Sequence, residues 1–453
     1  MNNRASLIVL TLLISTSSLL GAAPKKDRYP LPYPPKLPGD AACVTDSSPD
    51  FLKPGANLKE GVEIAKTPPV VDFMFMPNQD YPGNPWSAWG DGLVVGETYY
   101  SAIGDHKAPG GNAFVYRYDT AGKRLRQLVD LRRVLQMPDG HYTPGKIHSR
   151  IDLGDDGWLY FSTHRGSTRV TTDEYHYRGD WILRCEPEQN RVEIVAQAPL
   201  ARQCMPTSVL DPVRRIFYAG TADGDYRNKR VQFLAYDTVR RKLLYHDDRG
   251  PRRYMIFARS TGRVYFVPTE PDGTCPSPGR LVRFDPEQPG RPVPIDAQLG
   301  LRSATQETPQ GIVYTVDGDN LWAFDVRKER AKHLGPAVVG GETYVTSIDA
   351  DPKTGRYLYY IAGAHGGSYR DGTPLVQYDV NTRSRKVIAF LHPFYSEAYG
   401  FVPMGTYSSA VSPEGDKVYL TVNGNCGGGP EGRIRFNTCA LLVVHVPESE
   451  RQP

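Results

Sequence analysis

The sequence predicts an all-β chain that folds as a seven-bladed β-propeller. A two-strand phrase rich in β-branched and aromatic residues recurs seven times, with first runs such as GWLYFSTH and RRIFYAGT. The second run usually ends in Tyr-Asp or Phe-Asp, as in VQFLAYD, and in six copies a polar turn and a third apolar run follow. A period of roughly 40–60 residues built from short strands is typical of one four-stranded blade per repeat.

The chain divides by composition into three parts. Residues 1–23 resemble a signal peptide, because MNNR is positive, ASLIVLTLLISTSSLL is apolar and GAA offers small residues for cleavage. Residues 24–60 are Pro-rich and are expected to be largely irregular, and residues 61–453 are expected to form the propeller. The seven blades are predicted at Trp86–Leu131, Lys146–Ala196, Met205–His246, Arg253–Ile295, Arg302–Leu334, Tyr344–Leu391 and Met404–Val446.

The last blade is one strand short, because the chain ends soon after LLVVHVP. A ring needs that outer strand to avoid an open edge. The run GVEIAK at Gly61–Lys66 is the predicted source, so an N-terminal strand would close the ring.

Composition restricts the partners. The 453 residues carry a net charge of +4 and no block of like charge, so we expect no nucleic-acid partner, while an acidic ligand is permitted. No run after the signal is long enough to span a bilayer. We therefore expect a monomer that is secreted or periplasmic.

Export makes the six cysteines a candidate disulfide set. Cys426 and Cys439 flank one loop of the last blade, and Cys185 and Cys204 bracket the outer strand of blade two. These are the two predicted pairs, which leaves Cys43 and Cys275 unassigned. No C-x-x-C spacing indicates a thiolate metal site.

Polar residues gather at one predicted face of the ring, where the first strand of each blade starts and the second ends. In blade two, His148 and Arg150 open the first strand, and His164 and Arg165 close the second. Antiparallel neighbours lie about 5 Å apart, so the two imidazoles are expected to address one ligand together. Residues predicted to join them on this face are His106, Lys107, Tyr175, Tyr226, Arg253, Tyr254, His365 and Tyr407.

Other recurring residues are expected to be structural. The tyrosines in the middle of the second strands are predicted to pack between blades, and they are Tyr160, Tyr218, Tyr265 and Tyr359. The aspartates that end the third strands are predicted to be turn residues, and they are Asp119, Asp237, Asp285, Asp325 and Asp379.

The motifs GDH, GKIHSRID and WLYFSTH in the first blades resemble those of β-propeller polysaccharide lyases, above all the ulvan lyases and more distantly the oligogalacturonate lyases. In ulvan lyases a His and Tyr pair performs acid–base chemistry, a second His assists, and an Arg neutralises the uronate carboxylate. The resemblance implies these roles for His148, His164, Tyr226 and Arg165. Tyr254 and Arg253 are the substitutes for the last two.

The first functional hypothesis is a secreted lyase that cleaves an acidic, uronate-containing polysaccharide by β-elimination. Arg165 would hold the carboxylate, Tyr226 or His148 would take the proton, and His164 would assist the leaving oxygen. One alternative is a non-catalytic propeller that binds a glycan or a protein. Another is a metal-dependent propeller enzyme, because in oligogalacturonate lyases several His and a Gln hold a metal, and His106, His148 and His164 offer similar ligands. We expect no cofactor to be required.

Overall fold

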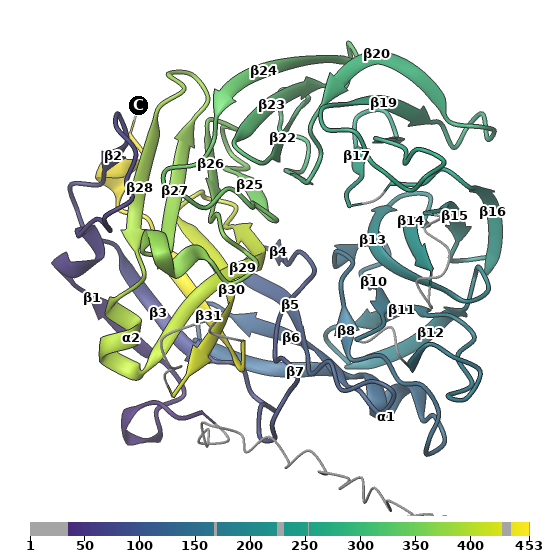
Figure 1. The fold of residues 1–453 in the computed structure, drawn as a ribbon, viewed down its shortest axis with the longest axis horizontal. Helices are drawn as coiled ribbons and strands as arrows, with labels where there is room; N and C mark the ends of the chain where they lie inside the picture. The colour runs from purple at the N-terminus through teal and green to yellow at the C-terminus, as the bar shows by residue number, and fades with distance from the viewer. Residues whose placement is uncertain (1–34, 167–169, 224–230, 252, 428–435, 453) are drawn as a thin grey trace, which may run out of the picture. The chain divides into compact units, whose positions relative to one another are not determined.

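The computed structural model describes residues 35–166, 170–223, 231–251, 253–427 and 436–452. The predicted signal peptide therefore lies outside the described residues. These described residues form one compact unit, and Figure 1 shows its sheets following one another around a ring in chain order. The fold is a seven-bladed β-propeller, as predicted.

Each of blades one to four is a sheet four strands wide, and its first strand is innermost. Blade one is β4 (Leu93–Val95), β5 (Thr98–Gly104), β6 (Ala113–Asp119) and β7 (Arg124–Asp130). Blade two is β8 (Lys146–Ile147) and β9 (Asp152–Leu153), which both pair with β10 (Leu159–His164), then β11 (Trp181–Glu186) and β12 (Arg191–Gln197). Blade three is β13 (Gln203–Asp211), β14 (Ile216–Asp223), β15 (Phe233–Asp237) and β16 (Lys242–Asp247). Blade four is β17 (Ile256–Ala258), β18 (Arg263–Phe266), β19 (Gly279–Phe284) and β20 (Val293–Leu299).

Three further blades complete the ring, and blades six and seven include strands from the N-terminal part of the chain. Blade five is β21 (Ser303–Ala304), β22 (Ile312–Asp317), β23 (Asn320–Asp325) and β24 (Arg330–Pro336). Blade six is β25 (Ile348–Ala350), β26 (Tyr357–Tyr360), β27 (Pro374–Asp379) and β28 (Arg385–Phe390), with β2 (Glu63–Ile64) at its edge. Blade seven is β29 (Phe401–Val411), β30 (Lys417–Cys426), β31 (Thr438–His445), β3 (Val70–Phe75) and β1 (Val44–Ser47). Among the described residues, two short α-helices lie between strands, α1 (Leu131–Leu135) and α2 (Phe394–Tyr399).

An N-terminal strand completes the last blade, but it is not the predicted one. β3 pairs antiparallel with β31, whereas β2, inside Gly61–Lys66, pairs parallel with β28 of blade six. β3 lies between β31 and β1 in the sheet, and its residues Val71, Phe73 and Met74 are almost fully buried. Both faces of this strand are therefore covered. β1 adds a further strand from the segment that was expected to be irregular, so that expectation is wrong for Val44–Ser47.

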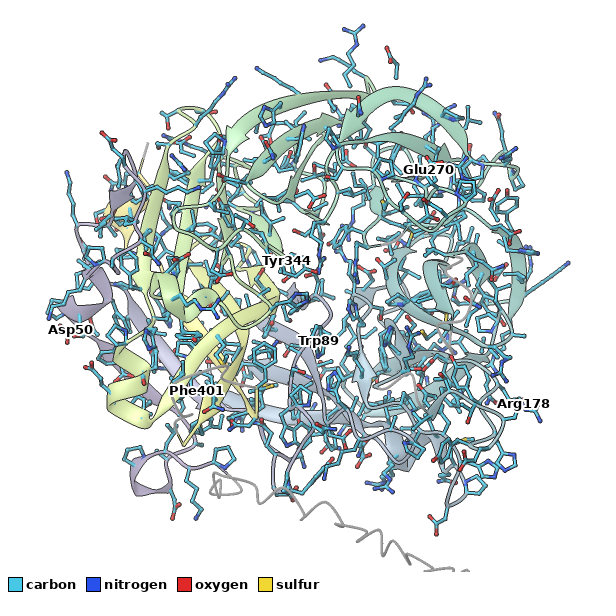
Figure 2. The ribbon with its side chains drawn as sticks, in the orientation of Figure 1. Asp50, Trp89, Arg178, Glu270, Tyr344 and Phe401 are labelled. Atoms are coloured by element: carbon cyan, nitrogen blue, oxygen red, sulfur yellow. The ribbon has the colours of Figure 1, made fainter. Side chains whose placement is uncertain are left out.

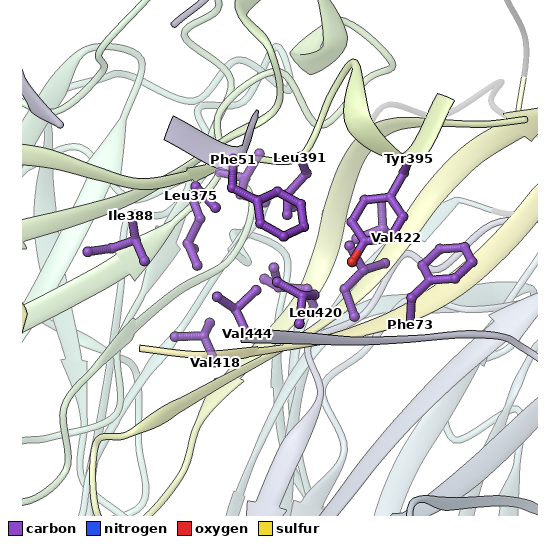
Figure 3. Close-up of a cluster of buried hydrophobic side chains, with 14 of the residues drawn as sticks. Phe51, Phe73, Leu375, Ile388, Leu391, Tyr395, Val418, Leu420, Val422 and Val444 are labelled. Carbon is purple, nitrogen blue, oxygen red and sulfur yellow. The ribbon is translucent and has the colours of Figure 1, made fainter. Parts of the chain in front are cut away.

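The core consists of seven apolar clusters, one between each pair of adjacent blades. Figure 3 shows the cluster between blades six and seven, where Phe73 of β3 lies near Tyr395 and Phe51 near Leu391. The interface between blades seven and one includes Met74 and Tyr99, so the apolar packing continues around the whole ring. This packing fixes the inner ends of the strands relative to one another.

The four recurring tyrosines and three of the recurring aspartates have the predicted structural roles. Tyr160, Tyr218, Tyr265 and Tyr359 are fully buried between blades. The Asp237 carboxylate accepts hydrogen bonds from the backbone N–H groups of Val239 and Arg240, as an Asx turn requires. Asp325 and Asp379 make the same pattern in their own blades.

Candidate functional site

Two imidazoles meet at the inner edge of blade two, as the sixteen-residue spacing predicts. Lys146 of β8 lies directly opposite His164 of β10 in the ladder. Lys146 and His148 are two residues apart, so their side chains leave the strand on the same face. The rings of His148 and His164 have centroids 5.4 Å apart.

The hydrogen bonds of three histidines fix their tautomers. Nδ1 of His148 lies 2.8 Å from the carbonyl oxygen of Pro206, and Nδ1 of His164 lies 2.6 Å from the carbonyl oxygen of Arg165. In His106 it lies 2.8 Å from the carbonyl oxygen of Pro85. A carbonyl oxygen can only accept, so Nδ1 carries the proton in each ring and the lone pair of the neutral imidazole is on Nε2. Each of these rings therefore has its basic nitrogen free of the backbone.

Trp89 lies at the centre of this group, on the connection that precedes β4. Its ring centroid lies 4.6 Å from that of Tyr407, 5.6 Å from His106, 5.9 Å from His148 and 6.1 Å from His365. The ammonium of Lys146 lies 4.0 Å from the same ring, in a cation–π contact.

Blades five and six add a second set of contacts. Arg302 donates a hydrogen bond from Nε to the Tyr344 hydroxyl, at 2.7 Å, and its guanidinium lies over the rings of Tyr344 and Tyr407. Tyr344 stacks on His365 with ring centroids 4.3 Å apart. Figure 2 labels Trp89 and Tyr344 on the central side of the ring. We call this set the rim cluster, and its members are Trp89, His106, Lys146, His148, His164, Arg302, Tyr344, His365 and Tyr407.

Burial and positive charge set the protonation of the rim cluster. Burial and then Lys146 and Arg302 hold the pKa of His148 well below its ordinary value. Burial and then Arg302 lower the pKa of His365 to about 4. Burial raises the pKa of the Tyr407 hydroxyl above its usual range. At neutral pH the site therefore holds uncharged imidazoles and a protonated Tyr407 hydroxyl beside the Arg302 guanidinium.

Arg150 and Tyr254 lie deeper, within a network of charged groups. Arg150 donates from Nη1 to the Tyr254 hydroxyl at 3.1 Å, and that hydroxyl donates to Asp91 at 2.6 Å. Arg150 also lies 3.4 Å from Asp152. Asp91, Arg150 and Tyr254 line both a small cavity beneath the rim cluster and a larger one of about 560 Å³, which extends to the opposite face.

Several predicted site residues lie elsewhere. Arg165 is only 4% exposed, and its guanidinium donates to Cys204 Sγ. Tyr175 packs against the apolar cluster between blades one and two. Lys107 is exposed, with its ammonium 5.1 Å from the Tyr81 ring. Tyr226 lies outside the described residues.

Arg253 is exposed close to the rim cluster, where its charge contributes to the lowered pKa values of His148 and His365. Sequence reasoning missed Trp89, Lys146, Arg302 and Tyr344. For Lys146 a signal was available, because it precedes His148 by two residues on a strand.

The rim cluster is a poor fit for a metal ion. In the described part of the chain no group of three or more His, Cys, Asp or Glu side chains converges as a metal site would require. The Nε2 atoms of the imidazoles would suit a transition metal, but Lys146 lies among them, and no carboxylate offsets its charge. We derive no step through a metal.

The predicted disulfides do not form, since neither Cys426 and Cys439 nor Cys185 and Cys204 are bridged. Cys439 pairs with Asn423 in the ladder, and Cys426 is three residues from Asn423, so the two thiols leave the sheet on opposite faces. They belong to different apolar clusters, on the two sides of blade seven. Cys185 pairs with Leu159 at one end of blade two, whereas Cys204 contacts Arg165 at the other end.

Comparison with solved structures gives the same fold. An oligogalacturonate lyase in complex with manganese is 12% identical, with a TM-score of 0.51, over 91% of this chain and 98% of that chain. U3-55K matches at 10% identity and a TM-score of 0.49, over 82% and 98% of the two chains. The β-propeller domain of the Trilobed protease from Pyrococcus furiosus matches at 11% and 0.44, over 75% and 90%. At these identities the likeness shows the fold alone.

No protein-family model and no curated protein matches the sequence. Among the described residues, no helix has the length and apolar character needed to cross a membrane.

Proposed function

We propose that the protein is an exported polysaccharide lyase that cleaves a uronate-containing chain by β-elimination. The observation that carries this proposal is that uncharged imidazoles and cations lie close together in and beside the rim cluster. His148 and His164 have free Nε2 atoms and lowered pKa values, and Lys146, Arg253 and Arg302 lie close to them. A base beside a positive potential suits proton removal next to a carboxylate.

The proposed reaction uses groups of this chain alone. Nε2 of His148 accepts the C5 proton, and the electrons of the C5–H bond form the C4–C5 double bond while the bond from C4 to the leaving oxygen breaks. The protonated Nε2 of His148 then gives that proton to the leaving oxygen, because the Tyr407 hydroxyl is buried. The rim cations offset the charge that develops on the carboxylate, a role first assigned to Arg165. His148 is thereby returned to its neutral form.

The test is a panel of ulvan, pectate and glycosaminoglycan substrates, followed by ultraviolet absorbance of the unsaturated product. His148→Asn keeps an amide donor for the Pro206 carbonyl but lacks the basic nitrogen, so we expect a loss of about 10²-fold or more in kcat. His333→Asn is the matched control, because His333 is exposed on the outer strand β24 and contacts Asn320. No absorbance rise with any substrate, or equal rates for His148→Asn and the control, would contradict the proposal.

A glycan-binding protein without catalysis is the second candidate. It is favoured by the partly exposed rings of Trp89 and Tyr344, which lie beside cations in the rim cluster. This function predicts glycan binding that survives replacement of His148 and His164 by Ala, with no unsaturated product from the wild-type protein. Loss of binding in the double variant would count against it.

A further inference from the structure

Lys146 is a cation held in the rim without a carboxylate partner among the described residues. Its side chain is partly buried, and its ammonium lies 4.0 Å from the centroid of the Trp89 ring. Other elements place further titratable groups near Lys146. These groups either shift the pKa of Lys146 or have their own pKa shifted by it. They are His106 after β5, His148 after β8, His164 and Arg165 at the end of β10, Cys204 of β13, Arg253 before β17 and His365 after β26.

These neighbours give Lys146 no compensating anion. The neutral imidazoles cannot donate from Nε2, and two of the charged groups are arginines. A cation removed from water is unfavourable unless a counter-ion or acceptors replace the lost hydration. The aromatic face of Trp89 supplies part of this, since a cation–π contact contributes about 0.5–2 kcal/mol. The rest of the coordination of Nζ is left for a ligand to supply.

We propose that Lys146 is the group that receives the carboxylate of an acidic sugar in the rim cluster. This inference rests on the proposed function and names the recognition group of that same site. Arg302 is already engaged with Tyr344, and Arg165 with Cys204, whereas Lys146 and Arg253 have no polar partner among the described residues. Of these two, Lys146 lies in the ladder directly opposite His164. The imidazoles of His148 and His164 lie on the same face of blade two, where the C5–H beside a bound carboxylate would meet them.

Binding at Lys146 must be coupled to a proton. Burial, and then the charges of Arg165 and Arg253, lower the pKa of Lys146 to about 7, while Cys204 acts in the opposite direction. A carboxylate beside Nζ favours the ammonium, so an acidic ligand binds with proton uptake above pH 7. Its affinity therefore falls by up to about tenfold per pH unit above pH 7.

The first test is competitive acetylation with limiting acetic anhydride at pH 7, read by peptide mass spectrometry. Only the uncharged amine reacts, and an ordinary lysine is unprotonated at well under about 0.1% at this pH. We expect Lys146 to react about tenfold or more faster than exposed Lys332, and glucuronate to protect Lys146 where glucose does not. Lack of protection by glucuronate, or equal protection by glucose, overturns the proposal.

The second test is calorimetric titration of glucuronate into two variants. Lys146→Met should lose about tenfold or more in affinity at pH 6.5, and Lys146→Arg should retain binding but lose its pH dependence between pH 7 and 9, because arginine stays charged. Wild-type affinity in Lys146→Met, or an unchanged pH slope in Lys146→Arg, contradicts the assignment. Protection and binding without any unsaturated product would support Lys146 as the carboxylate group while refuting the lyase proposal.

Discussion

At the scale of single residues, the backbone carbonyls of Pro85, Pro206 and Arg165 determine the chemistry of the rim. Each accepts a hydrogen bond from Nδ1 of a histidine, which orients the ring and leaves Nε2 as the basic atom. Burial, and then the cations nearby, keep these rings uncharged near neutral pH. The orientation of each histidine ring and its protonation state are thus set by different neighbours.

The first prediction concerns the pH dependence of the proposed reaction. His148 and His164 have folded-state pKa values well below 6.5, so the base remains available from pH 8 down to pH 6. We expect kcat to vary by less than about threefold over this range, while KM rises above pH 7 as Lys146 loses its proton. Initial-rate kinetics on the active substrate measure both, and a kcat that falls with an apparent pKa near 6.5 would be the opposite result.

The second prediction concerns stability. The pKa of Lys146 is about 7 in the folded protein and is expected to be about 10.4 in the unfolded chain, which therefore binds more protons between these values. The side chain accordingly destabilises the fold below pH 7, and this penalty disappears as the pH rises toward 10. Lys146→Met should raise the free energy of unfolding by on the order of 1 kcal/mol or more at pH 7 and by much less at pH 10. Urea denaturation at both pH values tests this, and a destabilised Lys146→Met at pH 7 would contradict it.

At the scale of elements, the tyrosines of the second strands show how blades pack. The hydroxyl of Tyr160 donates to Asp156 at 2.8 Å, whereas that of Tyr218 is buried with no hydrogen-bond partner in the described chain. Both rings fill the space between neighbouring blades. The tyrosine hydroxyl at this position of the repeat therefore has a hydrogen-bond partner in blade two, whereas in blade three it has none among the described residues.

This contrast gives a third prediction with a built-in control. Tyr160→Phe should destabilise the protein by about 1 kcal/mol, because it removes a hydrogen bond. Tyr218→Phe should be neutral or stabilising by up to about 1 kcal/mol, since it removes a buried hydroxyl that lacks a partner. Chemical denaturation of both variants decides the matter, and equal losses would show that the Tyr218 hydroxyl stabilises the fold as much as that of Tyr160.

At the scale of the whole molecule, β3 joins the two ends of the sequence. It pairs with β31, and Asp72 of β3 accepts a hydrogen bond from His445 Nε2 at 2.9 Å. Glu450 adds a second tie, because it accepts from the backbone N–H of Lys66 and from the Lys386 ammonium. Phe73 of β3 stacks on Tyr395 and Tyr399 in the cluster of Figure 3.

The fourth prediction is that ring closure is sensitive to β3. Phe73→Ala removes a fully buried ring and should cost about 3–5 kcal/mol in the free energy of unfolding. Val70→Ala is the control on the same strand, because Val70 is 40% exposed, and its cost should be below about 1 kcal/mol. Thermal unfolding compares the two, and similar losses would mean that β3 contributes little to closure.

The seven-bladed fold and the juxtaposition of His148 and His164 were predictable, because both follow from strand length and the order of strands in a repeat. The identity of the closing strand was not, since GVEIAK and VVDFMF are both short β-like runs and only the packing at β31 separates them. Trp89 was missed because it lies on a connection outside the repeating phrase.

Arg165 could have been excluded from the sequence. Adjacent residues of a strand point to opposite faces, so the residue after His164 turns away from the imidazole pair toward Cys204. Lys146 could have been included by the same alternation, as the neighbour of His148 two positions away. Arg302 and Tyr344 open the repeats of blades five and six as His148 opens that of blade two, and this equivalence was a usable signal.

The pairing of β3 with β31 has a consequence for synthesis in the cell. Asp72 and His445 are separated by 373 residues, and at 5–20 residues per second the ribosome needs roughly 20–75 s to make that distance. Throughout this interval an apolar strand must wait beside a growing, unsealed ring. Nascent chains therefore expose this apolar segment until β31 has been synthesised.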